Sequence, residues 1–397
     1  MANRYLIAAG GDWLDGTSNI WAAASGGAAD GGGIAIGDTA ILDANSGALA
    51  LKKGSVCAAF DTTGYTSTAT WADVPLYYPQ LGAVTHAAGT LAMGTCDPDW
   101  TSSSMTGGIL AGSGAMNIAG NISVTGGTMS HTGKWTQTAS ANVANNSFGR
   151  RFTHLSLGGA GVTSTLTDNV YAQEFTHGAG AVTGARIISI YAAANDFWHA
   201  GTGTIDISQI IVDIVSTART MGAMLVTSLS SGLTLTGTTG RKLTQTGPIN
   251  IGTSKLNIYP SNAGTAELDL AGSALTVGQI QIGTAAASNF SGILSLGEGI
   301  IRIGAGGLAR GNAANLANAL NFDSAYVENA AAIDCTGMAV TNVACHIMGG
   351  TVSNVNNGSA EPIHCHGTID GGGNTGVDFD KHAAPGHNPL VLVGVGA

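Results

Sequence analysis

The sequence has little charge. Lys, Arg, Asp and Glu together make up 10% of its 397 residues, whereas about 25% is typical of globular domains. The net charge of −10 at pH 7 gives a surface that repels phosphate backbones, so we expect no nucleic-acid partner. No apolar run reaches the roughly 18 residues of a membrane-spanning helix, so we expect no membrane insertion.

Paired cysteines and catalytic motifs are also missing. The five cysteines are an odd number and include no CxxC pair, which predicts free buried thiols in a chain made in a reducing cytoplasm. The opening MANRYLIAAGGDWLDG has no apolar stretch of signal-peptide length. Neither a Gly-x-Ser-x-Gly elbow nor a phosphate-binding loop occurs. We therefore expect a non-enzymatic chain with no catalytic residue and no cofactor.

Glycine and short segments that alternate between polar and apolar residues are abundant in this sequence. Glycine accounts for 61 residues and hydrophobic residues for 44%, enough apolar surface to offset the entropy of ordering the chain. Segments such as GTIDIS (203–208) and AELDLAGS (266–273) place one polar residue between two apolar ones. A period of two puts both apolar side chains on one face, so the pattern predicts an all-β fold.

The strands recur at regular intervals. Leu256, Leu268, Ile280 and Leu294 follow one another at nearly equal steps along the chain. Two steps cover about 25 residues, a repeat length typical of solenoids. The spacing predicts a parallel β-helix (β-solenoid). A β-sandwich of many short antiparallel strands is the alternative that alternation alone leaves open.

A Phe-x-His triplet recurs at nearly the same interval, at 152–154, 175–177 and 197–199. One coil later the backbone returns to the same edge about 4.8 Å further along the axis. We therefore expect Phe152, Phe175 and either Phe197 or Trp198 to stack inside the coils. His154, His177 and His199 would form a neutral hydrogen-bonded column, with a metal site or a pH-sensitive stack as the alternative.

Three regions are predicted along the chain. Residues 1–110, which hold four of the six tryptophans, form an N-terminal cap or attachment module, and residues 111–305 form the β-helix body. Residues 306–397 form a C-terminal region with a short helix, roughly Ala314 to Leu320, and a tail rich in His, Cys and Gly. This tail ends in the apolar segment PLVLVGVGA, which we expect to dock on its own chain or on a neighbour.

Two groups of potential metal ligands lie in that tail, although we expect no metal. His364 and His366 would share one face of a strand with Cys365 opposite, and their spacing fits no zinc-finger pattern. Asp370 and Asp378, with Asn374 and Asp380, lie in the Gly-rich stretch DGGGNTGVDFD. Oxygen ligands on a loop suit calcium, but the spacing is not that of an EF-hand.

The N-terminal segment up to about residue 65 resembles the start of tailed-bacteriophage structural proteins. The matching features are MANRY, GGDW with Trp13, Trp21, SGG at 25–27, DANS at 43–46 and DTTGYT at 61–66. The sequence departs from that pattern in YLIAAGGDW and in the alanine after Trp21.

The resemblance implies a virion component assembled in the host cytoplasm, such as a capsid decoration, a fibre or a tail appendage. It further implies a homotrimer that contacts other capsid or tail proteins. A tailspike that binds or cleaves host-surface glycans and a bacterial surface adhesin are the alternatives.

Overall fold

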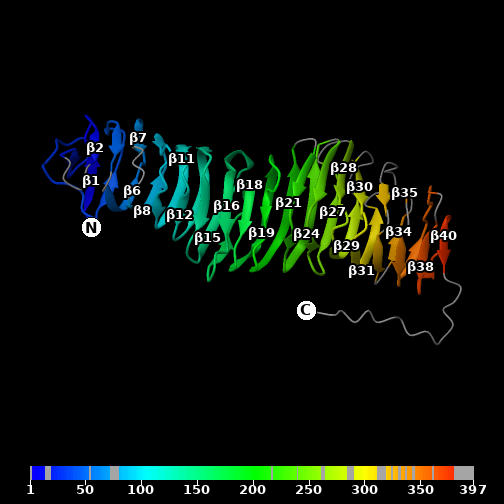
Figure 1. Cartoon of the computed structure of the whole chain (residues 1–397). Coiled ribbons are helices and arrows are strands. Elements are labelled where there is room, and N and C mark those ends of the chain that lie inside the picture. Colours follow the sequence, from blue (N-terminus) through cyan, green and yellow to red (C-terminus); the bar gives the residue numbers. More distant parts are fainter. Residues whose placement is uncertain are drawn as a thin grey trace.

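The computed structural model describes residues 2–13, 19–52, 55–71, 80–215, 218–238, 240–260, 264–283, 290–310, 319–322, 325–329, 332–335, 338–341, 345–359 and 362–379. The chain winds as a parallel β-solenoid of about 13 turns, with 60% of its residues in strands. The described residues contain no α-helix, and their single helical element is the 3-10 turn η1 (Phe148–Arg150). Successive coils stack into a rod that begins at the N-terminus (Figure 1). The predicted all-β solenoid is confirmed.

Three columns of parallel strands build the N-terminal half. The first column is β1 (Asn3–Leu6), β4 (Thr39–Ile41), β6 (Val56–Asp61), β8 (Gln80–His86), β11 (Ser102–Gly112), β13 (Ile122–His131), β15 (Ala141–Asn145), β17 (Thr163–Leu166), β19 (Ala181–Ala192), β21 (Thr204–Ile214) and β24 (Ser228–Gly237). The second is β2 (Gly11–Trp13), β5 (Leu49–Leu51), β7 (Thr68–Trp71) and β9 (Thr90–Ala92), continued by the ends of β11 and β13. The third is β10 (Asp99–Trp100), β12 (Met116–Ile118), β14 (Lys134–Gln137), β16 (Phe152–Leu157), β18 (Val170–His177) and β20 (Trp198–His199).

Three columns also build the C-terminal half. One runs from the ends of β19, β21 and β24 through β27 (Lys255–Ile258), β29 (Leu275–Ile282), β31 (Ile300–Arg310), β34 (Ala332–Asp334), β37 (Thr351–Ser353) and β39 (Ile369–Asp370). The next is β22 (Ala218–Met221), β25 (Arg241–Gln245), β28 (Gly264–Asp269), β30 (Phe290–Ser295), β32 (Ala319–Asn321) and β35 (Ala339–Thr341). The last is β23 (Met224–Leu225), β26 (Ile249–Asn250), the starts of β29 and β31, β33 (Tyr326–Asn329), β36 (His346–Met348), β38 (Ile363–His366) and β40 (Val377–Phe379).

The predicted repeat is confirmed in the C-terminal half. Leu256 lies opposite Ile280 in the next coil, and Leu268 lies opposite Leu294, so two of the predicted steps make one coil. These four side chains are all fully buried, because alternate residues of each strand point into the coil. Stacking apolar residues above one another produces a continuous core along the axis.

The predicted aromatic ladder is correct for one step and wrong for the other. Phe175 lies opposite Trp198 in the next coil, with ring centroids 5.1 Å apart. Phe152 does not stack on Phe175. It lies opposite Ala172, while Leu155 lies opposite Phe175. The reason is that the coil from β16 to β18 is shorter than the interval between the two Phe-x-His triplets, which shifts the register by three positions.

The predicted helix over Ala314 to Leu320 is wrong at its C-terminal end. Ala319 and Leu320 belong to β32, and residues 314–318 lie outside the described residues. Leu320 is fully buried between Leu294 of β30 and Val340 of β35. Burial in this stack and pairing on both sides override the helix propensity of an Ala- and Leu-rich segment.

The predicted region boundaries do not interrupt the ladder. Residue 110 lies within β11, which pairs with β8 and β9 before it and with β13 after it. Residue 305 lies within β31, which pairs with β29 and β33. The division into three regions therefore stays a prediction about the role of each region, because the described coils of all three belong to one solenoid.

The first coil has an arrangement of its own. β3 (Trp21–Ala22) pairs antiparallel with β1, in contrast to the parallel pairing of the later coils. Trp13 packs edge-on against Trp21 with ring centroids 5.0 Å apart, and Phe60 of the third coil contacts both Trp13 and Trp71 at 6.3 Å. Large aromatic rings thus fill the interior where the rod begins.

Candidate functional site

A stack of imidazoles runs along the outer face near the C-terminal end. His346 of β36 lies opposite His364 of β38, which in turn lies opposite Asp378 of β40. His346 Nδ1 is 2.9 Å from His366 Nε2, and its ring centroid is 5.3 Å from that of His364 and 5.2 Å from that of His366. Asp378 Oδ2 lies 3.5 Å from His364 Nδ1. The structure therefore brings three of the predicted candidates together, namely His364, His366 and Asp378. His346 lies against the rings of both histidines.

The cysteines of this region lie in the core. Cys365 is buried in the core, as the alternation predicts, and Cys335 and Cys345 are buried as well. Burial raises the pKa of the Cys335 thiol to about 12 and raises the pKa of Cys345 even further. These groups stay protonated thiols, whereas zinc binds thiolates. Within the ranges that the structure describes, no group of three or more His, Cys, Asp or Glu residues has metal-binding geometry.

The Gly-rich acidic stretch forms a turn. Asp370 Oδ1 accepts hydrogen bonds from the Gly372 amide at 2.8 Å and from Asn374 Nδ2 at 2.6 Å. Asp378 lies on β40, in a different column from Asp370 on β39, and faces His364 instead. Asp380 lies outside the described residues. The structure therefore does not bring Asp370 and Asp378 to one site.

The predicted column of His154, His177 and His199 is wrong. His154 and His199 face outward and both contact Oε1 of Glu174, at 3.1 Å from Nδ1 and 2.8 Å from Nε2 respectively. His177 points into the core and is 2% exposed. The short coil from β16 to β18 places Glu174, not His177, opposite His154. The acidic residue between the two imidazoles was not predicted, because its position depends on this register.

Three histidines lie in the interior, where neither the alternation nor the repeat predicts them. His86, His131 and His177 are each 2% exposed, and burial lowers the pKa of all three, that of His131 to about 4. His131 Nδ1 accepts a hydrogen bond from Trp135 Nε1 at 3.0 Å, so the neutral imidazole is the form that fits. Glycines at the neighbouring corners give these rings room: a Cβ on Gly108 would lie 2.6 Å from the His86 ring.

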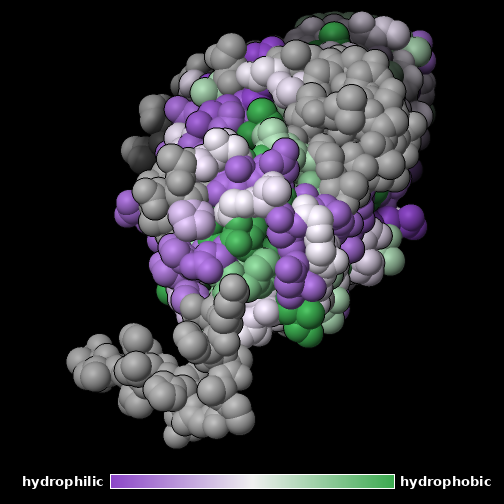
Figure 2. All heavy atoms as spheres, turned by 90° about the vertical axis from the view of Figure 1, so that its right-hand side faces the viewer, coloured by the Kyte–Doolittle hydropathy of each residue, from purple (hydrophilic) through white to green (hydrophobic). Residues whose placement is uncertain are grey.

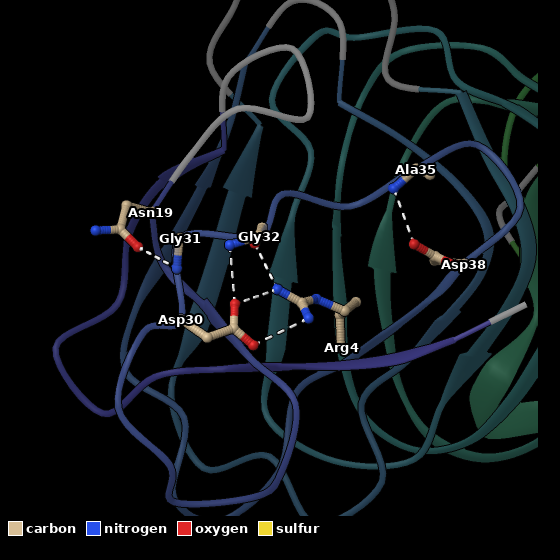
Figure 3. A network of polar contacts seen from close by, with 7 residues as sticks. All are labelled: Arg4, Asn19, Asp30, Gly31, Gly32, Ala35 and Asp38. Carbon is tan, nitrogen blue, oxygen red and sulfur yellow. Dashed lines mark hydrogen bonds and ion pairs between the residues drawn. The ribbon is translucent and has the colours of Figure 1, made fainter.

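A polar network fastens the loop that follows β3 (Figure 3). Arg4 on β1 donates to both carboxylate oxygens of Asp30, at 3.1 and 2.6 Å, and to the Gly32 carbonyl at 2.6 Å. The bond from Arg4 lowers the pKa of Asp30, assisted by the Gly32 amide that donates to Asp30 Oδ1. The Asn19 side chain accepts from the Gly31 amide, and Asp38 accepts from Ala35. All of these residues lie within the first 65 residues of the chain.

Replacing Arg4 with alanine is expected to release this loop while leaving the coils folded. Hydrogen exchange should accelerate at the Gly31 and Gly32 amides, which lie beside the carboxylate, and change little in β11 and β13. Arg4→Lys is the matched control, since it keeps the charge but loses the bidentate geometry, and intermediate protection is expected. Unchanged exchange in Arg4→Ala would contradict this assignment.

One apolar trough lies on the outer surface of the C-terminal half, with a volume of about 710 Å³. Its walls come from five successive coils, at residues 252–253, 276–278, 302–306, 328 and 348–349. Arg302 and Glu328 form an ion pair at one side, with Arg302 Nε 2.8 Å from Glu328 Oε2. Five of the lining residues are glycines, so the sequence gives no side-chain signal for this site.

Comparisons with known proteins give no match. No protein-family model matches it, and no curated protein or solved structure matches it either. Among the described residues, no helix has the length and apolar character needed to cross a lipid bilayer. Arguments about function therefore rest on the rod, its surface clusters and the sequence of the first coils.

Proposed function

We propose that this chain is a non-enzymatic structural component of a tailed-bacteriophage particle, working as a stiff rod in a capsid decoration, fibre or tail appendage. The supporting observation is the parallel ladder that passes from coil to coil from β4 to β40 around a continuous apolar core. In a parallel ladder each strand is fixed on both sides by hydrogen bonds, and closely packed interiors deform little. This geometry suits a shaft that must hold its shape.

The surface fits a packed assembly. With 10% charged residues, few charges have to be desolvated when rods lie side by side, so contacts between identical subunits cost little electrostatic free energy. We propose a homotrimer, consistent with the resemblance of the N-terminal segment to phage structural proteins. Capsid or tail proteins would be its other partners, and the virion its location.

A glycan-cleaving tailspike is the second candidate, and one surface pair favours it. Glu267 and Asp269 lie two residues apart on β28, so they are about 7 Å apart along one face, within the range of carboxylate pairs in glycosidases. Both also bind the ammonium group of Lys242, at 3.1 and 2.7 Å. This ion-paired arrangement supports a structural role for the pair, so we place this candidate second.

Particle purification tests the proposal directly. Phage particles from lysates of the host that produces this chain are separated on a density gradient, and gold-labelled antibody against the rod is used to image them. We expect the chain to sediment with DNA-filled particles and the label to mark one fixed position, and light scattering of the purified protein to give three times the 39.4 kDa chain mass.

Recovery of the chain only outside the particle fractions would overturn the proposal. Release of reducing sugar from host polysaccharide, lost in both Glu267→Gln and Asp269→Asn, would instead establish the tailspike. Asp206→Asn, which changes an exposed carboxylate on another column, is the control that should leave any such activity intact.

A further inference from the structure

The apolar trough follows the long axis of the rod. Thr276 lies opposite Arg302, Arg302 opposite Glu328, and Glu328 opposite Met348, one residue from each of four successive coils. Gly252 and Thr253, in the coil before Thr276, line the far end. Five coils at about 4.8 Å spacing make a channel about 19 Å long, the length of roughly six residues of extended chain.

The floor of the trough is shaped for a backbone rather than for a compact ligand. Gly278, Gly304 and Gly306 line it without side chains, and Ala305 and Met348 add apolar surface. Val277 and Ile303 also line the trough but belong to the core, at 2% and 4% exposure. The ion pair between Arg302 and Glu328 satisfies the charged groups of the wall with each other. A segment that fits must therefore be extended, apolar and uncharged.

The chain contains such a segment in the sequence that follows β40. Residues 389–397 read PLVLVGVGA, with no charged side chain, and lie outside the described residues. The last described strand, β40, is two coils beyond β36, which carries Met348 at the near end of the trough. That is about 10 Å along the axis. Residues 380–388 can span about 30 Å when extended, which exceeds that distance.

We propose that residues 389–397 fold back along the outside of the rod and lie in this trough, on the same chain. Their Leu and Val side chains would cover Ala305, Met348 and the glycine backbone of the floor, with the segment running from the Met348 end towards Thr253. Burial of this apolar surface drives the contact, and the covalent connection makes it intramolecular, at a high effective concentration. The segment would then bridge five coils, which are otherwise joined by the backbone hydrogen bonds between strands and by the packing of the core.

The rod has a second apolar surface that could receive the tail instead. Figure 2 views the C-terminal end, where hydrophobic residues lie between hydrophilic ones. Ile369 is 67% exposed there, and Val377 and Phe379 are only partly buried. The trough, in contrast to this end, matches an extended strand in length. The test has to separate the two locations.

Engineered cysteine pairs provide that test in the full-length chain. Leu392→Cys is combined in turn with Thr276→Cys in the trough, with Thr244→Cys on β25 in a neighbouring column, and with Ile369→Cys at the end of the rod. The native cysteines at 57, 96, 335, 345 and 365 are buried, so mild oxidation with diamide acts on the introduced pairs. Cross-links are read from non-reducing gels and peptide mass spectra.

We expect the Thr276 pair to cross-link within one chain at least ten times faster than the Thr244 and Ile369 pairs. Preferential linkage to Ile369 would move the tail to the end of the rod, linkage mainly between chains would assign the trough to a second copy, and equal rates for all pairs would show no docking. Each of these three results overturns the proposal.

A peptide measurement adds an independent readout. A fluorescein-labelled PLVLVGVGA peptide should bind the full-length double variant Leu390→Asp/Leu392→Asp, in which two charges expel the tail from the trough, at least tenfold more tightly than it binds the unaltered chain. Equal binding to both proteins, or binding to neither, would show that the trough is not held by the chain's own segment.

Discussion

Phe175→Ala is expected to lower the free energy of unfolding by about 3 to 5 kcal/mol. Phe175 is fully buried, packs against Trp198 at 5.1 Å and lies opposite Leu155. Truncation would open a cavity between two coils whose backbones are held at fixed spacing by the ladder, so the surroundings cannot collapse to fill it. Urea unfolding followed by tryptophan fluorescence and far-UV circular dichroism measures the loss.

Phe148→Ala is the matched control for this cavity. Phe148 is 44% exposed on the outer face, in contact with Tyr171 and Tyr191 and below the Arg151 guanidinium. Its truncation leaves no cavity, and the loss should stay near about 1 kcal/mol. Equal losses for the two variants would mean that the interior stack contributes no more than surface contacts, contrary to the packing described above.

Acidification from pH 7 to pH 4 is expected to destabilise the rod, with about 3 kcal/mol coming from His131 alone. Burial lowers the pKa of His131 to about 4 in the folded chain, against an ordinary value of 6.5. Between these values the unfolded chain takes up the proton and the folded chain does not. Stability is therefore full above pH 6.5 and falls as the pH drops towards 4. His86 and His177, whose pKa values are also lowered by burial, act in the same direction.

His131→Gln isolates this effect. A glutamine oxygen can still accept the hydrogen bond of Trp135 Nε1 but does not titrate, so the difference in unfolding free energy between pH 7 and pH 4 should shrink by about 3 kcal/mol. Gln137→Leu, at another buried polar position in the same part of the core, should shift stability equally at both pH values. If the His131→Gln variant kept the full difference in stability between pH 7 and pH 4, the pKa of this imidazole would not be lowered in the folded chain.

Alternation and repeat length were enough to predict the solenoid. Strands with apolar residues two apart must bury one face, and the intervals from Leu256 to Ile280 and from Leu268 to Leu294 match the observed register. Cys365 could also be placed inside and His364 and His366 outside, because each follows from the same alternation.

Register within individual coils could not be predicted. The coil from Thr163 to Ala181 is much shorter than the coil from Ile280 to Leu308, since corners lengthen and shorten without disturbing the pairing. A repeated triplet therefore need not recur on the same face, which is why His177 turns inward while His154 meets Glu174. The interior histidines and the trough were missed for a related reason: corners and glycines carry no periodic pattern.

The direction of the hydrogen bonds has a mechanical consequence. In this ladder they point along the rod, from one coil to the next. A pull along the axis therefore strains every bond between two neighbouring coils at once, and no single junction yields before the others around the same turn. A force perpendicular to the axis at either end loads the hydrogen bonds on one side of the terminal coil first, so the terminal coils should detach one after another. Such a rod therefore resists a pull along its axis far better than a sideways force at its ends.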